Sequence, residues 1–279
     1  MLKLPFTDLE YEDSRYILID GDILAYRASV LSEGLNRPSV SFDVVSGMMM
    51  RFIEGIGTTG YVIMLSGDHN FRKYLYPEYK ANRNKEKPVH FDEVRRYLST
   101  RYSCEICKWV EADDAIVSFA THITSTSTIT PVIVTLDKDL RQVPNSIFYN
   151  MVSGASENIT TDAAYKALFN QCLTGDTVDC IAGIKGVGKK KANKITDELV
   201  FTSLEDVYTK LVEVYASYGY TEKDAQAVYN CIVMQTNLPL LDIKGVDCPN
   251  LTINNIQTTI QKGVLDAYIY RGRIPNLPV

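Results

Sequence analysis

The chain has 279 residues, of which 46% are hydrophobic and 23% are charged. These fractions are ordinary for a globular protein with a sizeable core, and they exclude a disordered chain, a collagen-like fibre and a coiled coil. The length favours one large domain or two tightly packed ones. No apolar run approaches the roughly 18 residues that span a bilayer, and six cysteines are too few for a disulfide scaffold. We therefore expect a reduced, cytosolic protein without a membrane partner.

The net charge of −5 argues, taken alone, against a nucleic-acid partner. The average hides two basic segments, however. Residues 71–101 contain nine basic and four acidic side chains, and residues 181–196 contain five lysines and no acidic side chain. Such segments are usually solvated surfaces. Two of them in an acidic chain still raise the question of a phosphate-rich partner.

Apolar strands alternate with helices through the first 160 residues. In chain order the pattern predicts strand 15–21, helix 22–30, helix 42–56, strand 61–65, an exposed polar excursion over 70–87, helix 91–102, strand 105–110, helix 111–123, strand 131–136 and strand 146–151. This alternation predicts an α/β fold with a mostly parallel central sheet and helices on both of its faces.

The remaining chain has a different pattern. Helical spacing predicts helices over 161–173, 177–184, 188–198, 203–217 and 222–235. We therefore expect an α/β core over residues 1–160 and a helical part over residues 161–279.

Carboxylates follow three of the buried strands. Asp20 ends the first strand, Asp68 follows the second, and Asp137 and Asp139 follow the strand at 131–136. The carboxyl ends of parallel strands meet at one edge of a sheet, where ligands bind, so we expect these side chains to lie close together. Taken singly, each is also explained by a turn or by a helix cap, and capping of the following helix is the favoured role of Asp22.

Two further acidic groups have helical spacing. Glu111, Asp113 and Asp114 open the helix at 111–123, and Asp176 and Asp179 are three residues apart. Crowded carboxylates repel one another and lose hydration, and a divalent cation removes both penalties. Oxygen ligands without zinc-type spacing of His or Cys favour Mg²⁺ or Mn²⁺.

A glycine- and lysine-rich segment follows at about 177–196. Gly183, Gly186 and Gly188 predict a hairpin between two short helices, in which the backbone can approach a phosphate, and Lys189, Lys190 and Lys191 add positive charge. Spaced glycines also occur in dinucleotide-binding loops, but no strand precedes this segment.

Taken together and in order, these motifs resemble the 5′-nuclease superfamily. This family includes flap endonucleases, the 5′-nuclease domain of bacterial DNA polymerase I and bacteriophage 5′–3′ exonucleases. The resemblance covers about residues 15–200 and is most similar to a phage-encoded, stand-alone enzyme, which would act in the host cytoplasm. It is carried by Ile17-Leu18-Ile19-Asp20-Gly21, Ser66-Gly67-Asp68, Pro77-Glu78-Tyr79-Lys80-Ala81-Asn82-Arg83, Val110-Glu111-Ala112-Asp113-Asp114, Asp137-Lys138-Asp139, Gly175-Asp176-x-x-Asp179 and the 183–192 hairpin.

The resemblance implies a PIN-like α/β core and a two-metal phosphodiester hydrolase. A first Mg²⁺ would be held, directly or through water, by Asp20, Asp68, Glu111, Asp113 and Asp114. A second would be held or supported by Asp137, Asp139, Asp176 and Asp179. Mn²⁺ is allowed in place of Mg²⁺, and K⁺ is allowed at the hairpin, which matches a helix–two-turn–helix element that tracks duplex backbone.

The basic segment at about 70–100 matches the family's helical arch, although it is short for a full arch. In it, Lys80 would stabilise charge in the transition state and Arg83 would steer the scissile phosphate. Tyr79, Lys85 and Lys87 would contact DNA, the tyrosine by stacking on an unpaired base, for which packing is an equal alternative.

The expected activity is therefore that of a 5′–3′ exonuclease or flap endonuclease in replication or repair. Its partner would be DNA with a 5′ end, flap or nick, with RNA in RNA–DNA hybrids also allowed. Two alternatives stay open, a PIN-like metal-dependent ribonuclease and a non-catalytic DNA-binding module. The lone Cys104-x-x-Cys107 pair favours buried, reduced thiols over a zinc site.

Overall fold

The computed structural model describes residues 14–35, 37–75, 77–82, 86–107 and 110–234. Its centre is a sheet of six strands in the order β3-β2-β1-β4-β5-β6, in which β6 runs antiparallel to β5 and all other neighbours are parallel. The predicted, mostly parallel α/β sheet is thereby confirmed. The strands are β1 (Arg15–Asp20), β2 (Tyr61–Leu65), β3 (Cys104–Ile106), β4 (Thr130–Thr135), β5 (Ser146–Asn150) and β6 (Ser156–Ile159).

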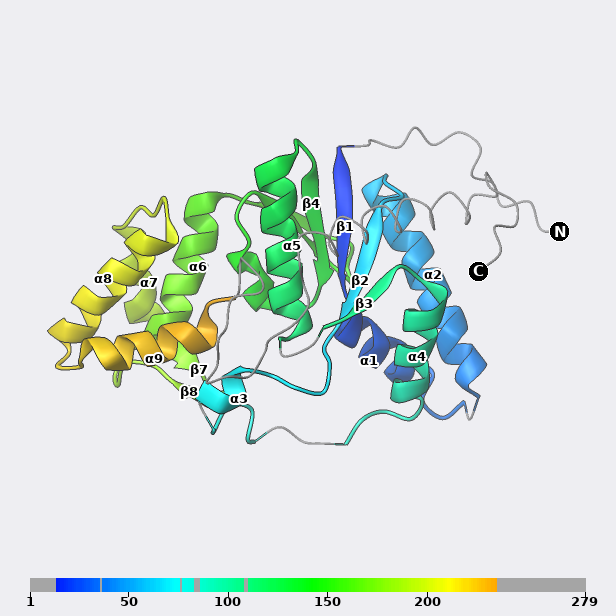
Figure 1. Ribbon diagram of the computed structural model, residues 1–279, viewed down its shortest axis with the longest axis horizontal. Helices are drawn as coiled ribbons and strands as arrows, with labels where there is room; N and C mark the ends of the chain where they lie inside the picture. Colours follow the sequence, from blue (N-terminus) through cyan, green and yellow to red (C-terminus); the bar gives the residue numbers. More distant parts are fainter. Residues whose placement is uncertain (1–13, 36, 76, 83–85, 108–109, 235–279) are drawn as a thin grey trace.

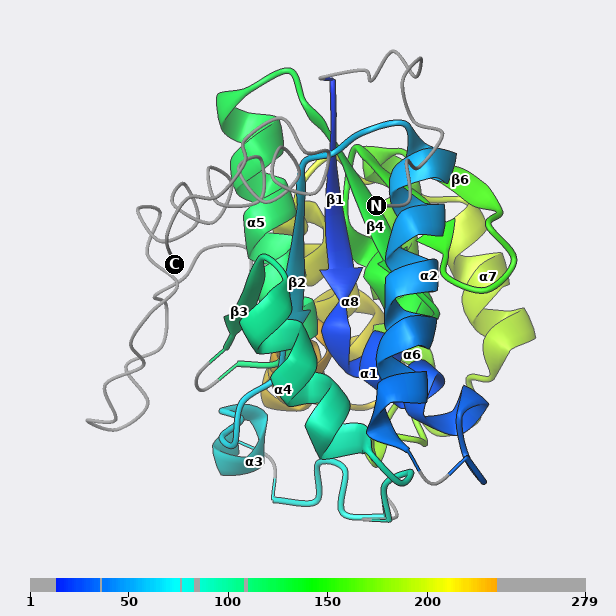
Figure 2. The same cartoon turned by 90° about the vertical axis from the view of Figure 1, so that its right-hand side faces the viewer.

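Helices cover both faces of the sheet, as the alternation predicted (Figures 1 and 2). Ile17 and Ile19 of β1 face the cluster that contains α1, α2 and α4, whereas Tyr16 and Leu18 face the cluster that contains α5. All four side chains are buried because a central parallel strand has no solvated face. The helices are α1 (Gly21–Leu31), α2 (Pro38–Ile56), α4 (Phe91–Arg101) and α5 (Ala112–Thr126).

The helical part has a hydrophobic cluster of its own. Phe169, Leu211 and Tyr215 are buried in it, and so is Tyr79 from the segment that follows β2. Figure 1 shows the helical part beside α5. A division of the chain at residue 160 stays a prediction. The helices are α6 (Thr161–Thr174), α7 (Lys189–Asp197), α8 (Leu204–Ser217) and α9 (Glu222–Ile232).

The helix predicted over 177–184 is wrong. The chain there forms a small antiparallel hairpin of β7 (Gly175–Asp176) and β8 (Ile181–Ala182). Gly175 has a left-handed backbone with φ of 70°, which ends α6. A Cβ atom on Gly183 would lie 2.3 Å from the Thr174 carbonyl carbon and 2.4 Å from the Gly175 nitrogen. The absence of a side chain at Gly183 therefore lets its backbone pack closely against that of Thr174 and Gly175.

The excursion over 70–87 is less exposed than predicted. It contains the short helix α3 (Arg72–Leu75), and Phe71, Arg72 and Tyr79 are at most 4% exposed. Glu78 and Lys87 remain exposed. The sequence pattern missed this burial because the buried residues include an arginine and do not recur with a regular period.

Two observations within the described residues bear on the expectations from composition. None of the helices there is long and apolar enough to cross a membrane. Cys104 and Cys107 are free thiols and both are buried.

Gly183→Ala should destabilise the protein, because the new methyl group meets backbone atoms that have no room to move. Overpacking of this kind costs about 1–3 kcal/mol in the free energy of unfolding. Gly47→Ala is the matched control, since Gly47 lies in α2 and a methyl group there would meet nothing within 4 Å. That change should be neutral or stabilising by up to about 1 kcal/mol. Urea unfolding of both variants tests the difference, and equal stabilities would contradict it.

Candidate active site

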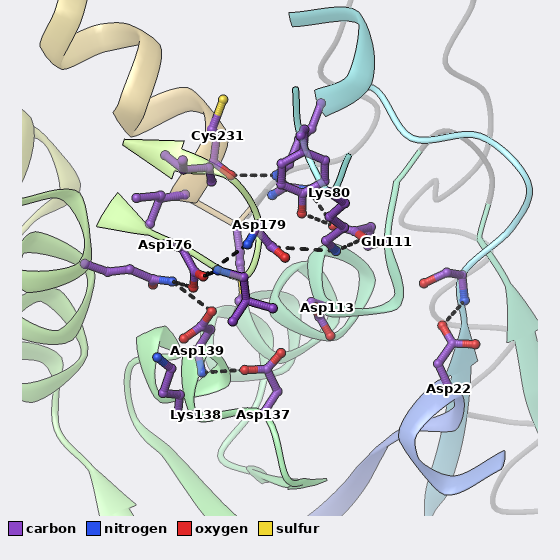
Figure 3. A pocket seen from close by; sticks show the side chains of 18 of the residues that line it. Asp22, Lys80, Glu111, Asp113, Asp137, Lys138, Asp139, Asp176, Asp179 and Cys231 are labelled. Carbon is purple, nitrogen blue, oxygen red and sulfur yellow. Dashed lines mark hydrogen bonds and ion pairs between the residues drawn. The ribbon is translucent and has the colours of Figure 1, made fainter. Parts of the chain in front are cut away.

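An acidic pocket of about 310 Å³ lies where the carboxyl ends of β1 and β4 meet the helical part. Figure 3 shows labelled carboxylates from the start of α5, the turn after β4 and the β7–β8 turn facing the same space. Three basic residues, Arg72, Lys80 and Lys138, also line the pocket. The acidic lining consists of Asp20, Asp22, Glu111, Asp113, Asp137, Asp139, Asp176 and Asp179.

Asp20 is the last residue of β1 and is 3% exposed. Its Oδ1 accepts the Ile23 N–H at 3.0 Å, so it is Asp20, and not Asp22, that caps α1. Its Oδ2 accepts the Thr135 hydroxyl at 2.9 Å, and that hydroxyl oxygen accepts the Asp137 N–H at 3.0 Å. Thr135 thereby ties the ends of β1 and β4 together.

The chain turns back over the pocket after β4. Asp137 caps the 3₁₀ helix η1 (Lys138–Gln142) and accepts the Asp139 N–H at 2.9 Å. This turn brings Asp137 and Asp139 to the same opening as Asp20. The prediction from the strand edge therefore describes their placement well.

Glu111 is held by three side chains at the start of α5. Tyr79 donates its hydroxyl to Oε2 at 2.6 Å, Lys80 pairs with Oε1, and the Arg72 guanidinium lies 3.6 Å away. Burial alone raises the pKa of Glu111, but the charges of Lys80 and Arg72 outweigh it and the pKa is lowered. Glu111 is therefore a charged carboxylate whose charge is already partly balanced.

Lys80 also contacts the hairpin of the helical part. Its Nζ lies 3.8 Å from Asp179 Oδ2, and its backbone N–H donates to the Asp179 carbonyl at 3.0 Å. Lys80 has a left-handed backbone with φ of 57°, which is uncommon for a residue with a side chain and is found most often at functional sites. The basic segment is thereby fixed to the β7–β8 turn.

Asp176 and Asp179 lie in that turn, close to the η1 carboxylates. Asp176 Oδ1 accepts the N–H groups of Val178 and Asp179, at 2.8 and 3.2 Å. Its Oδ2 accepts Gln171 Nε2 at 3.1 Å, and the same nitrogen donates to Asp139 Oδ2 at 2.8 Å.

Three of the predicted acidic residues lie differently from expectation. Asp68 is exposed, three residues beyond the end of β2, and does not line the pocket. Asp114 is 0% exposed and forms two hydrogen bonds with Arg72, at 2.6 and 2.7 Å. Asp22 lines the pocket but pairs with Arg95 and accepts the Ser66 N–H, and Figure 3 shows it apart from the other acids.

Several predicted nucleic-acid contacts are also placed. Tyr79 is 4% exposed and packed in the helical cluster, which favours the packing alternative over stacking on a base. Lys87 is exposed and lies 3.4 Å from Asp92. Arg83 and Lys85 lie outside the described residues. The remaining predicted contacts surround the start of α7: Gly186, Gly188, Lys189, Lys190 and Lys191 are exposed, and Gly183 is partly buried.

The chemistry of the pocket fits divalent cations, although within the described residues no three acidic, histidine or cysteine side chains already form a ready-made metal site. Burial raises the pKa of Asp20 and of Asp139 to about 6, with a further contribution from the charge of Asp137 in each case. Burial and the charges of Asp20, Asp137 and Glu111 raise the pKa of Asp113 well above its ordinary value. These acids are costly to ionise together, which is the condition that a bound cation relieves.

The Arg72–Asp114 pair should be essential for stability. Removing one partner leaves an uncompensated buried charge, so Arg72→Met should lower the free energy of unfolding by about 3–5 kcal/mol. Adding Asp114→Leu to that variant should recover part of the loss. Lys87→Met removes an exposed pair instead and should cost at most about 1 kcal/mol. Urea unfolding measures all three, and equal losses in the two single variants would contradict the assignment.

The chain is similar in sequence to a DNA polymerase I and to flap endonucleases. DNA polymerase I of Caldicellulosiruptor bescii is 28% identical over 229 residues, which are 73% of this chain and 26% of that protein. The chain thus spans about a quarter of the length of that relative. The flap endonuclease Xni of Shewanella halifaxensis is 24% identical over 246 residues, which are 81% of this chain and 95% of that one.

The fold is also shared with a solved structure. The flap endonuclease of bacteriophage T5, in a complex with DNA and metal ions, superposes with a TM-score of 0.64 at 16% identity, covering 91% of this chain and 99% of that one. The family described as "5′-3′ exonuclease, N-terminal resolvase-like domain" matches residues 15–169, which are more than half of the chain. The chain therefore belongs to the 5′–3′ exonuclease family.

Proposed function

We propose that this protein is a divalent-metal-dependent, structure-specific 5′ nuclease that hydrolyses phosphodiesters of duplex, nicked or flapped DNA in replication or repair. One observation carries the proposal. Seven carboxylates from strand ends, a helix start and the β7–β8 turn converge with Lys80 on one pocket: Asp20, Glu111, Asp113, Asp137, Asp139, Asp176 and Asp179. The flap endonuclease of Shewanella halifaxensis and the DNA- and metal-bound bacteriophage T5 structure support this proposal.

The seven acids would hold two Mg²⁺ ions, for which Mn²⁺ would substitute. In this proposal one ion is held by Asp20, Glu111 and Asp113, and the other by Asp137, Asp139, Asp176 and Asp179, of which Asp139 and Asp176 share the Gln171 amide. A pair of bound cations supplies an activated water and relieves the charge on the leaving oxygen. In this proposal Asp68 and Asp114 are not ligands, since one lies outside the pocket and the other is bound to Arg72.

Lys80 places a positive charge at the middle of the pocket. Its side chain is 13% exposed and pairs with Glu111 and Asp179, so its ammonium group is held where a phosphate would enter. It would donate hydrogen bonds to phosphate oxygens as negative charge grows in the transition state. Arg72 and Tyr79 fix Glu111, which in turn holds Lys80. Arg83, three residues on, would steer the same phosphate.

The exposed lysines of α7 would hold the duplex. Lys189, Lys190 and Lys191 form the first turn of this helix after Gly188, and Lys191 Nζ lies 4.7 Å from the centre of the Tyr218 ring. A helix start with clustered cations suits backbone phosphates. The turn before α7 would also be the place for a K⁺ ion.

A panel of 5′-labelled flap, nicked and blunt substrates, with DNA or RNA in the labelled strand, tests the proposal. We expect Mg²⁺-dependent cleavage of the DNA substrates that is lost in EDTA and in Asp139→Asn. Duplex binding should survive in that variant, because the lysines of α7 that would hold the duplex are unchanged. Cleavage of RNA alone would instead identify a ribonuclease, and tight binding without any cleavage would identify a DNA-binding module.

Replacing Lys189, Lys190 and Lys191 by alanine should weaken duplex binding and reduce its salt dependence. Each lost phosphate contact lowers the slope of log affinity against log salt by about 0.9, so the three together lower it by up to about 2.7. Lys210→Ala is the control and should leave the slope unchanged, since this lysine of α8 is half-exposed and already paired with Glu213. An unchanged slope in the triple variant would remove these lysines from the duplex interface.

Mg²⁺ should stabilise the protein more at about pH 7.5 than at about pH 5. The pKa of Asp20 and of Asp139 is about 6 in the folded protein, against an ordinary value of 3.8 that the unfolded chain keeps. Between these values the folded state holds more protons, so the metal-free protein loses stability as the pH rises from about 4 to above 6. A bound cation offsets this loss of stability only when the carboxylates are ionised, which is the case at about pH 7.5 and not at about pH 5. Melting temperatures with and without saturating Mg²⁺ measure the effect, and equal shifts at both pH values would contradict it.

A further inference from the structure

We infer that Gln171 is a positioning residue for the cation site on the η1 side of the pocket, and that Gln142 fixes the orientation of its amide. The inference rests on the proposed function, because it assigns how two of the proposed ligands are held. It concerns Asp139 and Asp176, which come from different parts of the fold, η1 and β7. Both lie on the same side of the pocket in Figure 3.

Gln171 bridges the two acids directly. Its Nε2 donates to Asp139 Oδ2 at 2.8 Å and to Asp176 Oδ2 at 3.1 Å. One amide group thus uses both of its hydrogens on two carboxylates. Gln171 lies near the end of α6, the helix that packs against η1 and leads directly into β7. It therefore joins an acid of the sheet edge to an acid of the helical part.

The orientation of the Gln171 amide is fixed from both sides. Ionised carboxylates only accept hydrogen bonds, so the amide nitrogen of Gln171 faces the acids and its oxygen faces away. That oxygen accepts Gln142 Nε2 at 2.6 Å. Gln142 is 7% exposed, and its own Oε1 is buried without a hydrogen-bond partner among the described residues, so its bond to Gln171 is the contact that orients it. Each hydrogen bond in the chain from Gln142 through Gln171 to the two acids therefore has a defined donor and a defined acceptor.

The geometry of η1 explains why both of its residues reach Gln171. Asp139 and Gln142 are three residues apart in a 3₁₀ helix, in which side chains at this spacing lie above one another. Both therefore reach the same residue of α6. The Gln171 amide is held at its nitrogen by one end of η1 and at its oxygen by the other.

The bridge carries no charge of its own. Glu111 is held by Lys80 and Arg72, and these cations balance its charge. Gln171 brings two carboxylates together with a neutral donor, so their negative charge is kept for a bound cation. Lys138, next to Asp139 in η1, also lines the pocket. Residues that orient metal ligands in this manner change metal affinity by about 10-fold to 100-fold when removed.

The test uses the full chain and Mn²⁺ alone as the probe. Gln171→Met keeps the length of the side chain and removes both donors, and Gln142→Met leaves the pocket lining intact and frees the Gln171 amide to turn. Gln226→Met, an exposed residue of α9, is the matched control. Mn²⁺ affinity is measured by electron paramagnetic resonance without DNA, melting of the metal-free protein checks folding, and cleavage of the flap substrate is followed as Mg²⁺ is raised.

We expect Gln171→Met to weaken Mn²⁺ binding by about 10-fold or more, and Gln142→Met to weaken it by less. Cleavage by both should require more Mg²⁺ and should recover as Mg²⁺ is raised, which a merely structural defect would not produce. If Gln171→Met does not fold, Gln142→Met decides the question from outside the pocket.

The inference and the proposed function fail in different ways. If the wild-type protein cleaves DNA and both variants bind Mn²⁺ as it does, the positioning role is overturned and the function stands. If the wild-type protein cleaves none of the substrates but Gln171→Met still lowers its Mn²⁺ affinity, the function is overturned and the positioning role stands.

Discussion

Repulsion between carboxylates is the constraint on which the rest of this structure depends. Asp20, Asp113 and Asp139 lie in one pocket where burial raises the pKa of each. Such an arrangement costs stability, and the fold tolerates it because the surrounding elements hold each acid in place. Thr135 joins the two central strand ends, Asp139 is bonded to Gln171, and the backbone of η1 satisfies Asp137. The crowding of these carboxylates is a condition that a bound cation would relieve.

The two sides of the pocket handle their charge differently. On the α5 side, Arg72 is bound by Asp114 and by the carbonyls of Cys231 and Val233, so it links α3, α5 and the end of α9 behind Glu111. On the η1 side, the bridging group is an amide. The first arrangement partly balances the charge of Glu111 and holds Lys80 in place, whereas in the second a neutral amide joins two acids.

The sequence predicts the sheet, most helices and most of the pocket because each rests on local pattern. Strand ends indicate Asp20 and Asp137, and helical spacing indicates α8 and α9. Asp68 is different because β2 ends at Leu65 and the chain does not turn back, whereas η1 returns Asp139 to the opening. Arg72, Tyr79 and Gln171 have no periodic signal. Their roles arise from contacts between distant segments, which one sequence does not display.

The bond between the Lys80 N–H and the Asp179 carbonyl has a mechanical consequence. The loop that carries the pocket lysine and the turn that leads into α7 form a single piece, reinforced by Asn82, whose side chain donates to the Thr177 carbonyl at 3.2 Å. In a nuclease of the proposed kind, the duplex-binding lysines of α7 and the cleavage pocket would then stay at a constant distance from each other. The position of the incision would therefore be set by its distance from the bound duplex.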